Sequence, residues 1–129
     1  MLEVIDLHKT YDGQPLLKGV SFSIEAGETI CLLGASGSGK STILRIIAGL
    51  ENAESGEVRW MGRSLADVPV HQRNFGLMFQ DYALFPHLDV FANVAFGLRM
   101  QNWPQARIGL RVAEVLGQTN LTAFAQRRV

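Results

Sequence analysis

A glycine-rich segment in the first third of the chain constrains the fold more than any other feature. Residues 34–41 read GASGSGKS and fit the pattern G-x-x-x-x-G-K-[ST] in full. The segment follows a short apolar run, Thr29–Leu33, and precedes an apolar-periodic stretch. Glycines let the backbone curl so that N–H groups point at phosphate oxygens, and a following helix presents its positive end to them. The pattern therefore predicts a nucleotide-binding loop between a buried strand and a helix.

Several residues of this loop have an expected role in binding ATP and Mg²⁺. Lys40 can reach the β- and γ-phosphates, the Ser41 hydroxyl can ligate Mg²⁺, and Thr42 can contact the α-phosphate. The alternative is an ordinary glycine-rich turn into a helix, but four fixed positions should match by chance in under ~1% of such chains. The predicted nucleotide-binding residues are Gly34, Ala35, Ser36, Gly37, Ser38, Gly39, Lys40, Ser41 and Thr42.

Composition is that of a cytosolic domain without a nucleic-acid partner. The 129 residues carry a formal net charge of zero, so no basic field draws the chain to nucleic acid or to an anionic membrane. The single cysteine, Cys31, lies in an apolar run and fits a reducing compartment. Glu3 and Asp6 stand where a signal peptide would be basic or apolar. No apolar run approaches the ~20 residues of a membrane span.

The first half of the chain reads as strands around one helix. Residues 2–11 and 16–25 alternate apolar and polar side chains, with an Asp12-Gly13 turn between them. The periodic stretch after the loop predicts a helix that Gly49 ends. Residues 55–65 suggest a small hairpin around Gly62.

The second half reads as a connector, a strand and helices. Residues 68–74 are expected to be a polar connector, followed by a buried strand, Phe75–Phe79. Asp89 can cap a helix that runs from Val90 to about Met100. Pro104 suits the first turn of a second helix, which we expect to end near Leu116. Residues 121–129 begin one or two further helical turns.

Three quoted stretches extend the argument beyond the loop. LHKTYDG, ASGSGKSTILRIIAGLENAESGEV and RNFGLMFQDYALFPHLDVFANVAFGL together closely resemble the ATP-binding subunit of ABC transporters, particularly importers for small solutes and ions. The resemblance runs from residue 2 to residue 129. It implies an α/β fold, a P-loop NTPase of the ABC ATPase type that is incomplete here. Residues 1–129 would be the N-terminal portion of one ATP-binding domain. About 1–80 would form an antiparallel β subdomain and part of the P-loop core. About 81–129 would form the glutamine loop and the first helices of the helical subdomain.

The resemblance also assigns roles outside the loop. It implies that Tyr11 stacks on adenine, whereas the plainer reading is a tyrosine at a strand end. Gln80 would contact Mg²⁺ and the attacking water, so that Gln80 and Lys40 are the catalytic candidates and Ser41 and Gln80 the metal contacts. Transmembrane permease subunits would dock near Tyr82–Val90, with contacts expected at Tyr82, Leu84, Phe85 and Pro86.

Other features of the family should lie beyond Val129. These are the LSGGQ-like signature loop, a strand ending in the Mg²⁺-binding carboxylate, a glutamate and a histidine. Asp81 could be mistaken for that carboxylate, but its neighbours match the glutamine loop. The missing strand would lie between Thr29–Leu33 and Phe75–Phe79. We therefore expect the 129 residues alone to be inactive, and to be unstable, swapped with another copy or a piece of a longer protein.

The resemblance places the complete protein on the cytoplasmic side of the membrane as a peripheral, head-to-tail dimer of ATP-binding subunits. The solute is not readable, although importers of metal ions, oxyanions, polyamines or sugars are favoured. Two alternatives stay open: a non-catalytic nucleotide-binding module, and another ATP-dependent enzyme such as a P-loop kinase or a chromosome-associated ATPase. His8, His71 and His87 share no metal-ligand spacing, and a reactive role for Cys31 is not expected.

Overall fold

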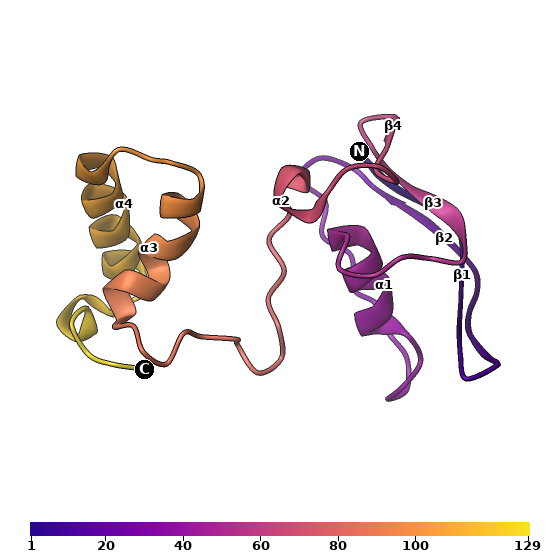
Figure 1. Ribbon diagram of the computed structural model, residues 1–129, viewed down its shortest axis with the longest axis horizontal. Helices are drawn as coiled ribbons and strands as arrows, with labels where there is room; N and C mark the ends of the chain where they lie inside the picture. Colours follow the sequence, from indigo (N-terminus) through magenta and orange to yellow (C-terminus); the bar gives the residue numbers. More distant parts are fainter. The chain divides into compact units, whose positions relative to one another are not determined.

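An antiparallel sheet of four strands, in the order β2-β1-β3-β4, is the framework of the first part of the chain. The computed structural model describes residues 1–129, which divide into two units, Met1–Leu77 and Met78–Val129 (Figure 1). The elements of the first unit are β1 (Leu2–Tyr11), β2 (Gln14–Ile24), α1 (Lys40–Ala48), β3 (Ser55–Trp60), β4 (Arg63–Ser64) and α2 (Val70–Arg73). The sheet therefore consists of the two predicted hairpins, β1–β2 and β3–β4, joined by the pairing of β1 with β3.

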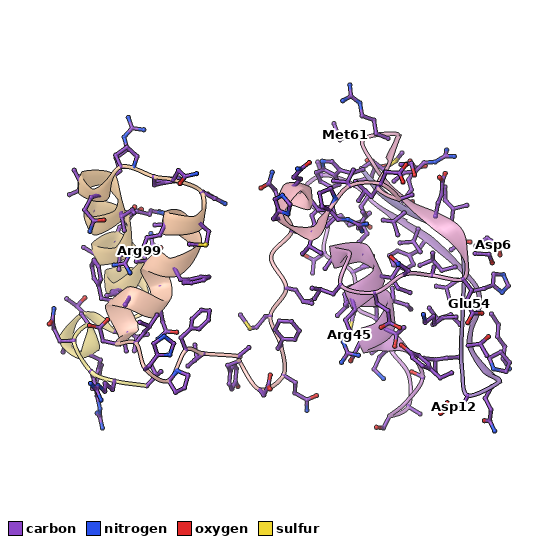
Figure 2. All side chains as sticks on the ribbon, viewed as in Figure 1. Asp6, Asp12, Arg45, Glu54, Met61 and Arg99 are labelled. Atoms are coloured by element: carbon purple, nitrogen blue, oxygen red, sulfur yellow. The ribbon has the colours of Figure 1, made fainter.

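Two tight turns set the register of the sheet. Asp12 and Gly13 join β1 to β2 with φ of 49° and 75°, and Met61 and Gly62 join β3 to β4 with φ of 52° and 75°. Positive φ at both central residues is what a two-residue hairpin of type I′ requires. Figure 2 labels Asp12 and Met61 at these turns. Both predicted hairpins are confirmed.

Helix α1 and the sheet share one hydrophobic core. Ile43 and Ile46 of α1 are buried in a cluster with side chains of the strands and of the β4–α2 connection: Leu2, Val4, Leu7, Leu17, Val58 and Leu65. The helix ends as predicted at Gly49, which adopts φ of 82°. Its N–H then reaches the carbonyls of the last turn.

The segment expected to be a polar connector contains a short helix, α2, and that expectation is wrong at Val70–Arg73. The Arg73 guanidinium donates to four carbonyl oxygens over distances of 2.7–3.1 Å, those of Ile46, Ile47, Leu65 and Val68. Partial burial lowers its pKa from the usual value. Because two of these carbonyls are at the end of α1, Arg73 ties the helix to the β4–α2 connection. Sequence reasoning assigns no role to Arg73, because the Ile46 carbonyl that it binds is 27 residues away along the chain and no local pattern links the two.

Two predicted strands are not formed. Neither Thr29–Leu33 nor Phe75–Phe79 belongs to the sheet, Cys31 is exposed, and Leu33 is 87% exposed. The expectation that these runs are buried strands is wrong because a β ladder needs a neighbouring backbone, and neither run has one beside it. An apolar cavity of about 250 Å³ instead lies next to the second run; it is lined by Leu2, Leu44, Ile47, Ala48, Asn74, Phe75, Gly76 and Leu77.

The second unit is a pair of helices, and the C-terminal residues of the chain hydrogen-bond to the start of the first of them. It contains α3 (Val90–Met100), α4 (Gln105–Gln118) and a 3₁₀ turn, η1 (Thr122–Phe124). The predicted helices are confirmed, α4 running two residues past Leu116, and the Asp89 carboxylate accepts from the Ala92 N–H at 2.6 Å as a cap. Ala95, Ile108, Val112 and Leu116 form its core. None of the helices has the length and apolar character needed to cross a membrane.

We expect the Gly56→Ala substitution to destabilise the first unit strongly. Gly56 has φ of 85°, and an added Cβ would lie 2.2 Å from the Asp6 carbonyl oxygen, so β1 and β3 would have to separate. Gly62 is a matched control, because it has φ of 75° with open space around it. The Gly62→Ala variant should be destabilised only by the ~1–2 kcal/mol that a left-handed backbone conformation costs alanine. Urea unfolding followed by tryptophan fluorescence measures both, and equal midpoints would contradict the prediction.

Candidate functional site

Three glycines of the glycine-rich loop have positive φ: Gly34, Gly37 and Gly39. Gly37 has φ of 77° with open space around it, and Gly39, directly before α1, has φ of 91°. A Cβ on Gly39 would lie 2.6 Å from a methyl group of Leu17 and 3.2 Å from the Leu16 Cγ. The start of α1 is thus pressed against β2 at a place that only glycine can occupy.

The Lys40 side chain folds back onto the loop that precedes it. Its Nζ donates to the carbonyl oxygens of Gly34 at 2.8 Å and Ala35 at 2.7 Å, and to the Ser38 Oγ at 3.3 Å. The ammonium group therefore lies beside the loop backbone, where the charge of a phosphate can be neutralised.

The first turn of α1 is open to a ligand. Gly39 caps the helix without any side-chain acceptor, so its first N–H groups are not occupied by a cap. Ser41 is exposed, and Thr42 is buried with only 7% of its surface accessible. Uncapped N–H groups, a lysine ammonium and an exposed hydroxyl form a cradle suited to the anionic phosphates of a nucleotide and to Mg²⁺.

Tyr11 ends β1 close to the same turn. The residue is 43% exposed, and its hydroxyl donates to the Glu51 carboxylate. That hydrogen bond raises the pKa of Tyr11, partial desolvation raises it further, and the nearby Thr42 hydroxyl lowers it. Sequence reasoning identifies Tyr11 but misses Glu51. One signal in the sequence could have pointed to Glu51. It is an acidic residue near the C-terminus of a predicted helix, where a negative charge is unfavourable unless it has another partner.

The remaining predicted site residues are in the second unit. Gln80 is exposed, as are Tyr82 and Leu84, at 71% and 55%. Tyr11 and the loop thus belong to the first unit, and Gln80 and Tyr82–Val90 belong to the second. Asp81 is exposed and belongs to no cluster of metal-ligating side chains, and His8 is hydrogen-bonded locally, 3.1 Å from Asp6.

The predicted docking segment packs in part on α3. Phe85 is half-buried, and its ring packs on Phe96 with the ring centroids 4.4 Å apart. The Asn93 side chain fixes this turn: its Oδ1 accepts from the Phe85 N–H at 2.9 Å, and its Nδ2 donates to the carbonyls of Phe85 at 3.1 Å and Asp89 at 3.0 Å. Asn93 thereby holds the segment before α3 in one conformation and leaves Tyr82 and Leu84 outward.

Replacing Asn93 by alanine should loosen this turn, since the Phe85 N–H and the carbonyls of Phe85, Leu88 and Asp89 lose their hydrogen bonds to its side chain. We expect a loss of about 1–3 kcal/mol in local stability and faster hydrogen exchange at the Phe85 amide. Gln105→Ala is the control, an exposed amide without a side-chain hydrogen bond in the same unit. Unchanged exchange at Phe85 in the Asn93 variant would show that the turn does not depend on this side chain.

Known proteins share this arrangement over the whole chain. Residues 17–129 match the ABC transporter family. The putrescine transport ATP-binding protein PotG of Escherichia coli is 47% identical over 128 residues, which are 99% of this chain and 34% of that protein. The spermidine/putrescine import ATP-binding protein PotA of Mesoplasma florum is 43% identical over 129 residues, all of this chain and 37% of that protein. The chain thus spans about a third of the length of these curated relatives.

A solved structure agrees with the sequence match. It is the ATP-binding cassette MJ0796, described as dimeric, in a post-hydrolysis state and bound to ADP and Pi. The likeness has a TM-score of 0.86 at 29% identity and covers 99% of this chain and 61% of that chain. Because the family match includes the phosphate-binding loop, helix α1 and the helical unit, the chain belongs to the ABC transporter family.

Proposed function

We propose that these residues are the nucleotide-binding N-terminal part of the ATP-binding subunit of an ABC importer. The complete protein would bind Mg-ATP and hydrolyse it to drive solute uptake. The single observation that carries the proposal is the cradle formed by the Lys40 ammonium and the uncapped start of α1. Membership of the ABC transporter family narrows the general phosphate site to ATP.

Each group of the cradle has a proposed task. Lys40 exchanges its loop acceptors for the β- and γ-phosphate oxygens, and the N–H groups of residues 37–42 bind the remaining oxygens. The Ser41 hydroxyl holds Mg²⁺, which neutralises charge on the phosphates when it is bound. Thr42 contacts the α-phosphate, and Tyr11 stacks on adenine. Gln80 orients water and contacts Mg²⁺, a role that rests on the family resemblance alone.

The assembly is also a proposal. A second ATP-binding subunit would pair head-to-tail with this one, which the dimeric state named for the solved relative supports. Transmembrane permease subunits would dock near Tyr82–Val90, and the exposure of Tyr82 and Leu84 suits such a contact. The protein would then be peripheral, at the cytoplasmic face of the membrane. Residues 1–80 and 81–129 would serve as the ATP-binding part and the permease-docking part.

Polyamines are the proposed cargo. The support comes from the relatives, whose names specify putrescine or spermidine/putrescine, at identities of 42–47%. No residue of this chain is proposed to touch the cargo, because the ATP-binding subunit acts through its permease partners.

Lys40→Ala should weaken ATP binding at least ~10-fold, because a hydrogen-bonded charge is worth about 1.5–3 kcal/mol. Lys18→Ala, which changes an exposed lysine of β2, should leave the affinity unchanged. Titration calorimetry with Mg-ATP measures both. If the two variants bind ATP equally, the cradle is not the nucleotide site. If ATP binding is normal but turnover is absent even with the permease partners, the non-catalytic module is the better description.

Cells that lack the gene encoding these residues should take up labelled putrescine or spermidine more slowly than the parent, and the intact gene should restore uptake while its Lys40→Ala form should not. Maltose and sulfate uptake are the controls and should not change. If polyamine uptake is normal and another solute is lost, the ATP-binding role stands and the cargo assignment fails.

A further inference from the structure

The surroundings of Tyr11 are more elaborate than those of an ordinary tyrosine at a strand end. Behind it, the Lys9 ammonium lies 5.4 Å from the centroid of the ring and 3.4 Å from the Glu51 carboxylate, and it donates to the Asn52 carbonyl at 2.8 Å. Glu51 in turn accepts from the Tyr11 hydroxyl. One carboxylate therefore holds both the ring, through its hydroxyl, and the cation that faces the ring.

This cluster is better fixed than a surface ion pair. The side chains of Lys9 and Glu51 are only 18% and 17% exposed, whereas exposed pairs contribute little because both partners stay mobile. The segment that follows Glu51 is also tied to β1 through Glu54. The Thr10 N–H donates to a Glu54 carboxylate oxygen at 2.9 Å, and the Glu54 N–H donates to the His8 carbonyl at 2.9 Å. Figure 2 labels Glu54 on the segment that leads into β3, beside β1.

The arrangement leaves one side of the ring for a ligand. Lys9 lies over one face of the ring, and Tyr11 as a whole residue is 43% exposed. The hydrogen bond to Glu51 raises the pKa of Tyr11, and the Thr42 hydroxyl, which belongs to the first turn of α1, lowers it. A planar base attached to phosphates in the loop can therefore reach an aromatic surface that is already oriented.

We propose that Glu51 and Lys9 are positioning residues for the nucleotide base: they hold the Tyr11 ring in place so that its open face receives adenine without loss of side-chain freedom. The inference rests on the proposed function, because it requires that ATP binds at the loop. Freezing a side chain on binding lowers affinity, and a ring that is held beforehand avoids that loss. Glu51 would therefore contribute to binding of the base and not to binding of the phosphates.

The test compares ATP with inorganic tripolyphosphate, which has the phosphates and no base. Glu51→Ala should weaken ATP binding about 3–10-fold and leave tripolyphosphate binding unchanged. Glu51→Gln, which keeps an acceptor for the Tyr11 hydroxyl, should lose less than Glu51→Ala. Glu25→Ala is the matched control, an exposed glutamate just after β2. Circular dichroism checks that each variant is folded, and Glu51→Gln carries the test if Glu51→Ala is not.

Tyr11→Phe separates the hydroxyl from the ring. It should reproduce most of the Glu51→Ala loss, and adding Glu51→Ala to it should cost little more. A full additional loss in that background, an equal loss for ATP and tripolyphosphate, or unchanged ATP affinity in Glu51→Ala would each overturn the inference. The Tyr11→Ala variant distinguishes failure of this inference from failure of the proposed function. If Tyr11→Ala binds ATP normally, base stacking on Tyr11 is wrong. If Tyr11→Ala weakens ATP binding and Glu51→Ala does not, only the positioning role is wrong.

Discussion

The attachment of helix α1 to the sheet is the constraint on which the rest of the first unit depends. The helix contributes Ile43 and Ile46 to the core, and both of its ends are fixed by contacts that permit no other arrangement. At its start, Gly39 touches Leu17 closely enough to exclude a Cβ. At its end, Arg73 binds the last carbonyls, and a Cβ on Gly49 would lie 2.7 Å from the guanidinium. The glycine-rich loop ends at the first of these fixed points.

The phosphate cradle follows from the attachment. Lys40 is the first residue of α1, so its ammonium and the uncapped N–H groups keep one geometry relative to β1 and β2. Tyr11, at the end of β1, is fixed in the sheet opposite Gln14 and hydrogen-bonds to Glu51. A loop that a ligand has to order binds it more weakly than a loop that is already held in place.

The sequence predicts those parts of the fold that depend on local interactions. The hairpins follow from Asp12-Gly13 and Gly62, and the helix ends from Gly49, Asp89 and Pro104, because each depends on a few adjacent residues. Thr29–Leu33 and Phe75–Phe79 are apolar enough to form strands, yet they do not, because pairing needs a backbone supplied from elsewhere. Their composition alone cannot reveal whether that neighbour is present.

The candidate site also has a part that depends on adjacent residues and a part that depends on residues far apart in the sequence. The loop is readable because its chemistry lies within eight consecutive residues, but Glu51 is 40 residues from Tyr11 and only the folded sheet brings them together. The distance explains why motif reading finds the groups that touch a ligand more readily than those that hold them. A ligand imposes its own spacing on the residues that bind it, as phosphates would on the loop under the proposed function. A supporting carboxylate has to meet only one hydroxyl and one ammonium, and any segment that passes nearby can supply it.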